Sequence, residues 1–267
     1  MSFYLEDDKF RTVMELCYHH YDIEAYDKAT EYAKKAIRMV PEHWEGYAWL
    51  ANTLLEKYYE LISNLDTPRE LFKEAYNAAR LAAKYCPEEP FVWCVLGDCA
   101  YAMWQFDESR KAHLKALSLD YTCAHCWTRI AFCIVKEKGF LPTPNKKAEI
   151  QNYFNQSIKV YHKGSRNFWN NWGCIWECCK NIEKAEEYYY RELKENPNNA
   201  MAINNIGEIF LARGDKEEAD KWFRKALQIN PTIKRFHWNL TRKPNSPLVS
   251  EYKEQECSTR ISSEVLK

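Results

Sequence analysis

Residues 200–231 read AMAINNIGEIFLARGDKEEADKWFRKALQINP, and this stretch decides the fold. Counted from Ala200 as position 1, large apolar side chains fall at positions 4, 7, 11 and 24, and small residues at positions 8, 20 and 27. Steps of three and four place these side chains on one face of a helix. Gly214 and Asp215 separate two helical halves, and Pro231 ends the second half because proline lacks the N–H that would continue it. The stretch therefore predicts two helices joined by a tight turn.

Two features indicate how these helices meet. Asp215, followed three residues later by Glu218, is typical of a capping box at the start of the second helix. Gly207 adds no side chain to the inner face of the first helix, so the second helix can approach closely. A single helix pair cannot bury both of its faces, and it therefore needs neighbouring pairs.

The spacing resembles the tetratricopeptide repeat, a helix–turn–helix unit of about 34 residues. The resemblance implies an all-α fold, a right-handed superhelical solenoid of about six repeats with a C-terminal capping helix. It also implies that the first helix of each repeat lines a concave groove. Counting outward from residues 200–231, we expect a lead-in at 1–9, repeats at 10–43, 44–89, 90–123, 124–165, 166–199 and 200–233, and a capping segment with a polar tail at 234–267.

Some parts of the chain depart from this pattern. The second half of repeat 44–89 arrives 12 residues late, and we expect the insertion to lengthen both of its helices. Repeat 124–165 is interrupted by the turn-forming segment KEKGFLPTPNKK at 136–147. Glu192 occupies a position where the pattern has a small residue, which makes the packing of repeat 166–199 uncertain. The tail from Arg242 onward is polar, contains prolines and is expected to be loose.

Composition limits the classes of function. Lys and Arg total 38 and Asp and Glu total 38, so no general basic field attracts nucleic acid. No apolar run approaches the roughly 20 residues of a membrane span, and the acidic start MSFYLEDDKF differs from a signal peptide. The 11 cysteines follow helical stripes, which favours free thiols in a reducing compartment. Such a compartment is the cytoplasm or the nucleus, and we expect a cytoplasmic protein with no nucleic-acid and no membrane partner.

Catalytic or metal chemistry has weak support in the sequence. No nucleophile–base constellation and no Gly-rich phosphate loop is present, so we expect no enzyme and no cofactor. Cys123-Ala124-His125-Cys126 resembles half of a zinc site, but structural zinc takes four protein ligands and no second CxxC follows. His113 and Cys133 could be recruited, although both sit at ordinary helix positions. Unligated thiols are the favoured interpretation, so no metal is expected, and a metal- or redox-responsive repeat protein stays open as a third hypothesis.

The resemblance also implies where a partner binds. In this family, groove-lining side chains come from positions 2, 5, 6, 9, 12 and 13 of each repeat. Asn171 and Asn205 lie 34 residues apart at equivalent positions, and an amide can pair with both the C=O and the N–H of a peptide backbone. The alternative is that these asparagines are merely solvated. The candidate partner-binding residues are Asn167, Asn170, Asn171, Asn204, Asn205 and Glu208 in the C-terminal half, and Arg129, Tyr101 and Trp49 in the middle of the chain.

Together these features predict a non-catalytic protein–protein interaction adaptor that binds a partner peptide or segment in the groove. The Lys and Asn clamp that some family members use for a C-terminal carboxylate is not matched, since Met14 and Tyr18 stand there. The alternative function is a structural subunit of a multiprotein assembly, or a self-associating scaffold. The oligomeric state and the partner's identity stay open.

Overall fold

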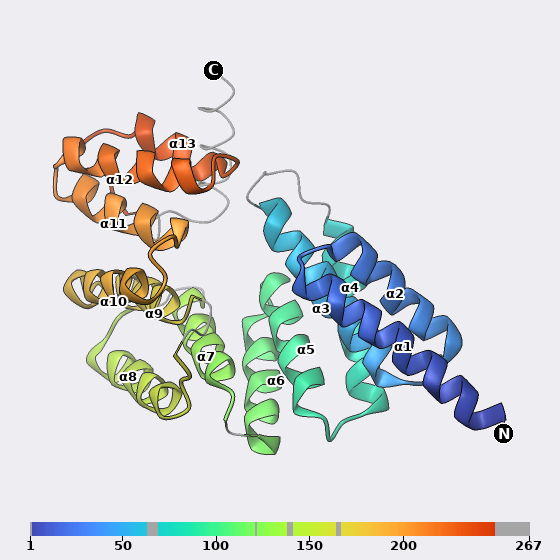
Figure 1. Cartoon of the computed structure of the whole chain (residues 1–267). Helices are drawn as coiled ribbons and strands as arrows, with labels where there is room; N and C mark the ends of the chain where they lie inside the picture. Colours follow the sequence, from blue (N-terminus) through green and yellow to red (C-terminus); the bar gives the residue numbers. More distant parts are fainter. Residues whose placement is uncertain (1, 63–68, 121, 138–140, 164–166, 249–267) are drawn as a thin grey trace. The chain divides into compact units, whose positions relative to one another are not determined.

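The structure, a computed structural model, describes residues 2–62, 69–120, 122–137, 141–163 and 167–248, with side chains in these ranges except at 2–7, 59–62 and 69–71. The described residues form thirteen helices and no strand (Figure 1). The helices are α1 (Ser2–Asp22), α2 (Tyr26–Met39), α3 (Trp44–Ile62), α4 (Arg69–Tyr85), α5 (Pro90–Ala102), α6 (Phe106–Leu119), α7 (Ala124–Lys136), α8 (Pro144–Lys159), α9 (Phe168–Cys178), α10 (Ile182–Glu195), α11 (Ala200–Ala212), α12 (Lys216–Ile229) and α13 (Lys234–Thr241). None of the helices in these ranges is both long and apolar enough to cross a membrane.

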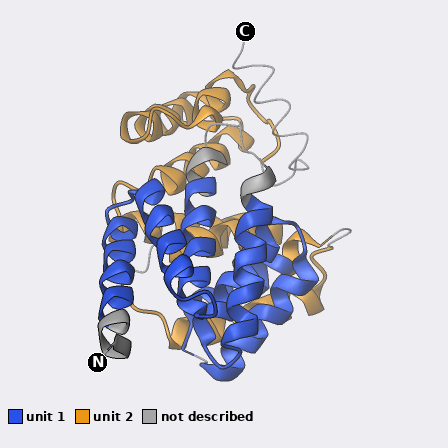
Figure 2. Cartoon of the chain, turned by 90° about the vertical axis from the view of Figure 1, so that its right-hand side faces the viewer, with its two compact units in different colours: residues 1–62, 66–133 blue, residues 63–65, 134–267 orange. Residues whose placement is uncertain are grey.

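The chain divides into two compact units (Figure 2). Unit 1 comprises Met1–Ile62 and Asp66–Cys133, and unit 2 comprises Ser63–Leu65 and Ile134–Lys267. In unit 1, α1 packs with α2, α3 with α4, and α5 with α6; successive pairs meet through α2 and α3 and through α4 and α5. In unit 2, the pairs α9–α10 and α11–α12 meet through α10 and α11, and α13 packs against α12. Each unit is therefore a stack of helix pairs.

In the pairs α5–α6, α9–α10 and α11–α12, a glycine of the first helix faces an aromatic ring of the second. A Cβ built on Gly207 of α11 would lie 2.7 Å from the ring of Phe223 in α12. Real Cβ atoms almost never approach another heavy atom so closely, so glycine is required for the observed helix spacing. The sequence-based expectation that Gly207 permits close approach is confirmed. The expected cap at Asp215 is also present, since its side chain accepts a hydrogen bond from Glu218 N at 3.0 Å.

Successive pairs are joined by a recurring hydrogen bond. The side chain of the fourth residue in a first helix is hydrogen-bonded to the carbonyl oxygen of the proline six residues earlier. The three examples are Tyr47 with Pro41 at 2.9 Å, Trp93 with Pro87 at 2.7 Å, and His237 with Pro231 at 2.8 Å. The large fourth residue thus fixes the turn between pairs in addition to packing.

Helix lengths account for the irregular segments. The helices α3 and α4 contain 19 and 17 residues, against 13 and 14 in α5 and α6, so inserted residues of 44–89 lie within helices. Thr143 caps α8 by accepting from Lys146 N at 3.4 Å, and Pro144 follows as the first helical residue. The helix α1 already begins at Ser2 rather than near Phe10. No glycine or proline among residues 1–9 would stop it.

The start of the C-terminal tail packs against unit 2, contrary to the expectation of a loose tail from Arg242. Asn245 N donates to Leu211 O at 2.9 Å, and Leu248 is only 5% exposed. The guanidinium of Arg242 lies 5.0 Å from the ring of Trp238, a distance typical of a cation–π contact. These contacts hold residues 242–248 in place, because they give the polar segment partners that its composition does not reveal. Residues 249–267 of the predicted tail lie outside the described residues.

Candidate partner-binding surfaces

Four half-buried aromatic side chains form a continuous row across α1, α3 and α5, which are the first helices of the three helix pairs in unit 1. The ring of Trp49 in α3 lies 4.6 Å from Tyr18 and 5.2 Å from Tyr21, both in α1. On the other side it lies 5.4 Å from Phe91 in α5. We call Tyr18, Tyr21, Trp49 and Phe91 the aromatic row. Trp49, one of the predicted binding residues, is at its centre.

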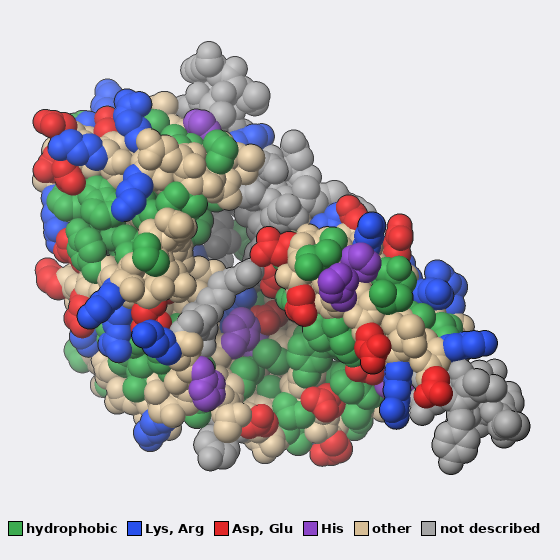
Figure 3. All heavy atoms as spheres, in the orientation of Figure 1, with side chains coloured by type: hydrophobic (Ala, Val, Ile, Leu, Met, Phe, Trp, Pro, Cys, Tyr) green, Lys and Arg blue, Asp and Glu red, His purple; other side chains and the backbone are tan. Residues whose placement is uncertain are grey.

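Hydrogen bonding orients the end of this row. Tyr18 OH donates to the carboxylate of Glu45 at the start of α3. Burial and the Glu45 carboxylate raise the pKa of Tyr18, so its hydroxyl stays neutral and remains a donor. Figure 3 shows hydrophobic side chains gathered over α3 and α5 of unit 1, with carboxylate groups beside them. This face therefore combines exposed apolar area with acidic margins.

The predicted residues Arg129 and Tyr101 meet in unit 1. The Arg129 guanidinium lies 5.2 Å from the centre of the Tyr101 ring, and its Nε is 2.8 Å from Asp98 Oδ1. His125 Nε2 lies 2.8 Å from Asp98 Oδ2. Burial alone would raise the pKa of Asp98, but His125 and Arg129 outweigh it and hold that pKa well below its usual value. Asp98 is therefore ionised and fixes Arg129 over the tyrosine ring.

In unit 2, asparagines connect successive first helices. Asn205 Nδ2 of α11 donates to Asn170 Oδ1 of α9 at 3.0 Å, and Asn239 Nδ2 of α13 donates to Asn204 Oδ1 of α11 at 2.7 Å. Both bonds span 35 residues. We call Asn170, Asn204, Asn205 and Asn239 the asparagine ladder. All four side chains are buried, so the ladder joins helices from within the unit.

Glu208 completes this interior network. Its carboxylate is 1% exposed and accepts from Asn204 Nδ2 at 2.9 Å and from Asn239 Nδ2 at 3.1 Å. Arg235 Nε donates to it at 3.1 Å, and Arg242 Nη1 lies 3.6 Å from its second oxygen. A buried carboxylate is stable only with such partners. Arg235, with 27% of its side chain exposed, forms the accessible edge of the network.

Glu192 explains the departure from the repeat pattern in α10. Asn167, before α9, has φ 59° and ψ 15° and makes no side-chain cap. Glu192 Oε2 instead accepts from Trp169 N at 3.1 Å and from Asn170 N at 3.2 Å, two of the free N–H groups at the start of α9. The carboxylate is fully buried there. Glu192, which departs from the repeat pattern in α10, is thus the cap of the neighbouring helix α9.

The structure places the nine predicted binding residues at four different locations. Five of them lie in the interior network of unit 2: Asn170, Asn204, Asn205 and Glu208 in its centre, and Asn167, which accepts from Asn199 Nδ2 at 2.7 Å, at its edge. Asn171 is half-buried on α9. Arg129 and Tyr101 form the stacked pair, and Trp49 belongs to the aromatic row.

The sequence predicts that these asparagines face an open groove. In the structure they instead contact side chains of the next first helix. The helix α13 continues the series of first helices, so Asn239 and Arg235 occupy the amide and carboxylate groups of α11. The ladder also joins Asn205 to Asn170 rather than to Asn171. Sequence reasoning missed Arg235, Asn239 and Arg242. A further 34-residue step from Asn205 reaches Asn239 and would have found it.

Metal-ligating side chains also gather in unit 1. Cys126 Sγ, in the first turn of α7, lies 3.6 Å from Cys94 Sγ of α5. Both sulfur atoms lie within 4.8 Å of a ring nitrogen of His113 from α6. A second group, Cys94, Asp98 and His125, shares Cys94. Cys123, Cys126 and His113 are recognisable as candidate ligands in the sequence, but Cys94 is not, because a cysteine in the middle of an apolar helix gives no local signal.

The geometry defines an all-α protein of stacked helix pairs, and the comparisons with known proteins agree. Residues 200–233 match the family model described as tetratricopeptide repeat. The crystal structure of the APC/C hetero-tetramer Cut9–Hcn1 superposes with a TM-score of 0.69 at 14% identity, covering 87% of this chain and 42% of that chain. The structure of pilF from Pseudomonas aeruginosa gives 0.58 at 15% identity, covering 87% of this chain and 98% of that chain. Residues 200–233 thus contain a tetratricopeptide repeat, and the chain has the fold of these two solved structures.

Two curated proteins are also similar to this chain in sequence. The human protein O-mannosyl-transferase TMTC3 is 25% identical over 209 residues, which is 78% of this chain and 21% of TMTC3. Subunit 3 of the anaphase-promoting complex of Schizosaccharomyces pombe is 23% identical over 145 residues, which is 54% of this chain and 20% of that protein. The chain thus matches about a fifth of the length of each relative.

Proposed function

We propose that this chain is a non-catalytic protein–protein interaction adaptor that binds a partner segment on the first-helix surface of unit 1. The observation that carries the proposal is the aromatic row, whose four half-buried rings run without a break over α1, α3 and α5. Tyrosine, tryptophan, phenylalanine and arginine are enriched in the centres of protein interfaces. Rings already held by their neighbours also lose little conformational freedom on binding, which favours affinity.

The surface indicates the chemistry of the partner. A segment with apolar or aromatic side chains would cover the exposed parts of the aromatic row. The carboxylates beside it favour basic residues at the edge of that segment, because opposite charges steer association. Arg129, held by Asp98 over Tyr101, adds a planar cation that a partner's aromatic or carbonyl group can contact.

A peptide-display selection on the full chain tests the proposal. The affinity of a selected peptide is then measured for wild type and for Trp49→Ala. We expect a loss of about 30-fold, since truncating a central interface tryptophan costs about 2 kcal/mol or more. Leu114→Ala is the matched control, because Leu114 is an apolar side chain, 44% exposed, on the second helix α6. Equal affinity for wild type and Trp49→Ala would refute the proposal.

Partner binding by the asparagines of unit 2 remains a prediction. Binding through Asn170, Asn204, Asn205 or Glu208 would require a partner to replace hydrogen bonds that these side chains make within the chain. Asn171→Ala is therefore a cleaner test than a variant that includes Asn205. It removes a half-buried amide without opening the ladder.

A second candidate function is that of a structural subunit in a permanent assembly. The observation that favours it is the likeness to Cut9–Hcn1, which is a hetero-tetramer, and to a subunit of the anaphase-promoting complex. Sedimentation velocity of the isolated chain over a range of concentrations separates the two functions. A free adaptor stays monodisperse, whereas a subunit or scaffold self-associates or aggregates without its partners.

The proposed setting is the cytoplasm, with no nucleic-acid and no membrane partner. All ten cysteines in the described part of the chain are free thiols, as expected in a reducing compartment. The balance of 38 basic and 38 acidic residues provides no general attraction for polyanions.

A further inference from the structure

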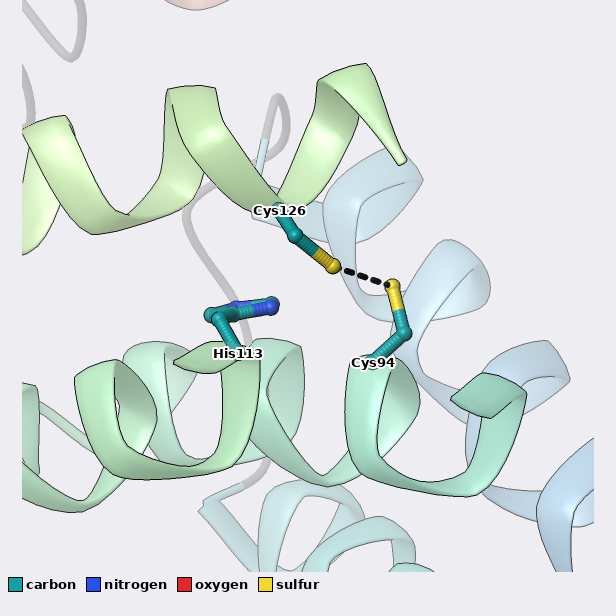
Figure 4. A group of neighbouring side chains, drawn as sticks. All are labelled: Cys94, His113 and Cys126. Atoms are coloured by element: carbon teal, nitrogen blue, oxygen red, sulfur yellow. Dashed lines mark hydrogen bonds between the residues drawn. The ribbon is translucent and has the colours of Figure 1, made fainter. Parts of the chain in front are cut away.

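Three side chains of the kinds that bind zinc, those of Cys94, His113 and Cys126, meet in unit 1, contributed by α5, α6 and the start of α7. Figure 4 shows the ring of His113 directed toward the sulfur atoms of Cys94 and Cys126. The two sulfur atoms are 3.6 Å apart, and a His113 ring nitrogen lies within 4.8 Å of both. These groups come from three helices, so the fold, and not a local loop, brings them together.

Cys123 provides a fourth candidate ligand. Its Sγ accepts a hydrogen bond from Cys126 N at 3.4 Å. The Cys123 thiol also interacts with the thiols of Cys126 and Cys94. Cys123 therefore lies beside the Cys94–Cys126 pair.

His113 is buried without a hydrogen-bond partner for either ring nitrogen. Its side chain is 0% exposed, and its Nε2 lies 3.7 Å from Asp98 Oδ1, beyond hydrogen-bond distance. A buried imidazole normally finds a partner. The ring is held against α5, because a Cβ on Gly97 would lie 2.6 Å from it.

We propose that Cys94, His113, Cys123 and Cys126 bind one Zn²⁺ ion. Three thiolates and one imidazole form a common structural zinc set. With Zn–S bonds of about 2.3 Å, tetrahedral geometry places two sulfur ligands roughly 3.8 Å apart, close to the observed 3.6 Å. A disulfide would need about 2.05 Å.

The neighbouring group formed by Cys94, Asp98 and His125 is a weaker candidate. The Asp98 carboxylate already pairs with Arg129 at 2.8 Å and with His125 at 2.8 Å. A cation there would have to displace a guanidinium. In the cysteine-rich group, by contrast, the imidazole makes no hydrogen bond that a cation would have to break. Bound zinc would cross-link α5, α6 and α7 within unit 1.

The test uses the full chain, expressed in zinc-supplemented medium and purified under reducing conditions without chelators. Mass spectrometry of the metal content is expected to find about one Zn²⁺ per chain. Cys94→Ser and His113→Gln should each retain at least about tenfold less zinc after dialysis. Cys133→Ala is the matched control: Cys133 is also a buried α7 cysteine, but its thiol bonds to Ser109 Oγ at 3.2 Å, and the variant should keep its zinc.

A second measurement does not depend on the variants folding. Titration of the reduced, metal-free wild-type chain with Co²⁺ should produce thiolate-to-cobalt charge-transfer bands and the d–d bands of tetrahedral cobalt, saturating at one equivalent. Wild type without zinc and without this spectrum would overturn the proposal. Zinc retained by both variants, or lost on His125→Ala while His113→Gln keeps it, would overturn it equally.

Discussion

The carboxylate of Glu208 in α11 accepts a hydrogen bond from Arg235 Nε, 3.1 Å away and 27 residues later in the chain. In unit 1, Asp98 and His125 are paired across the same separation of 27 residues. In each case the residue four positions further on completes the arrangement, Asn239 for Glu208 and Arg129 for Asp98. An acid at the ninth position of one first helix therefore binds the second and sixth residues of the next.

Glu208→Gln tests how much this arrangement contributes in unit 2. The change removes the charge that Arg235 and Arg242 share, and the Arg242 side chain is only 4% exposed. Leaving a buried charge unpaired costs about 3–5 kcal/mol. We therefore expect the backbone amides of α11–α13 to exchange hydrogen faster in the variant than in wild type at low denaturant.

The control for Glu208→Gln is Glu217→Gln. Glu217 forms an ion pair with Lys221, but its side chain is 86% exposed. Surface pairs of this kind contribute about 0–1 kcal/mol. Similar exchange rates in the two variants would show that the interior network contributes little.

Gly207→Ala is expected to destabilise the α11–α12 pair. The added Cβ would lie 2.7 Å from the Phe223 ring, and overpacking of this kind costs about 1–3 kcal/mol. This outweighs the roughly 1 kcal/mol that alanine gains over glycine in a helix. Urea denaturation measures the change. The double variant Gly207→Ala/Phe223→Leu should recover part of the loss, and no recovery would mean that the clash is not with Phe223.

The sequence predicted the apolar framework well, because helix pairing depends on periodic features that one repeat displays completely. Gly207 and the Asp215 cap are of this kind. The asparagine ladder is different, since the bond from Asn205 to Asn170 depends on how two repeats stack and not on either repeat alone. The repeat spacing therefore singles out Asn205 as a candidate, but it does not reveal Asn170 as its partner within the chain. Cys94 was missed for the same reason, because its neighbours come from two other helices.

Glu192→Ala is expected to loosen the start of α9. The change removes the acceptor for Trp169 N and Asn170 N, which are buried and have no other cap. Losing the partner of a buried donor costs about 1–3 kcal/mol. Hydrogen exchange of these two amides should accelerate before that of α11. Glu187→Ala, an exposed change on the same helix, should leave both amides protected.

The reactivity of Cys17 should report the integrity of α1 and α2. Its thiol is 0% exposed and bonds to Ala29 O at 3.3 Å, and burial raises its pKa from 9.0 to about 12. Alkylation requires the thiolate. At pH 8 the folded thiol would therefore react about 10³-fold more slowly than a thiol with the ordinary pKa of 9.0.

The same shift sets the direction of a pH effect on stability. Because the folded pKa of Cys17 lies above the unfolded value of 9.0, the folded chain holds its proton more tightly between pH 9 and about 12. Its contribution to the free energy of unfolding is complete below pH 9 and decreases as the pH rises through this interval.

Peptide mapping after iodoacetamide treatment, with half-buried Cys86 as the internal reference, measures the labelling rates. Comparable labelling of Cys17 and Cys86 in the folded chain would contradict a sealed α1–α2 pair, whereas equal labelling in urea is expected because unfolding exposes both thiols.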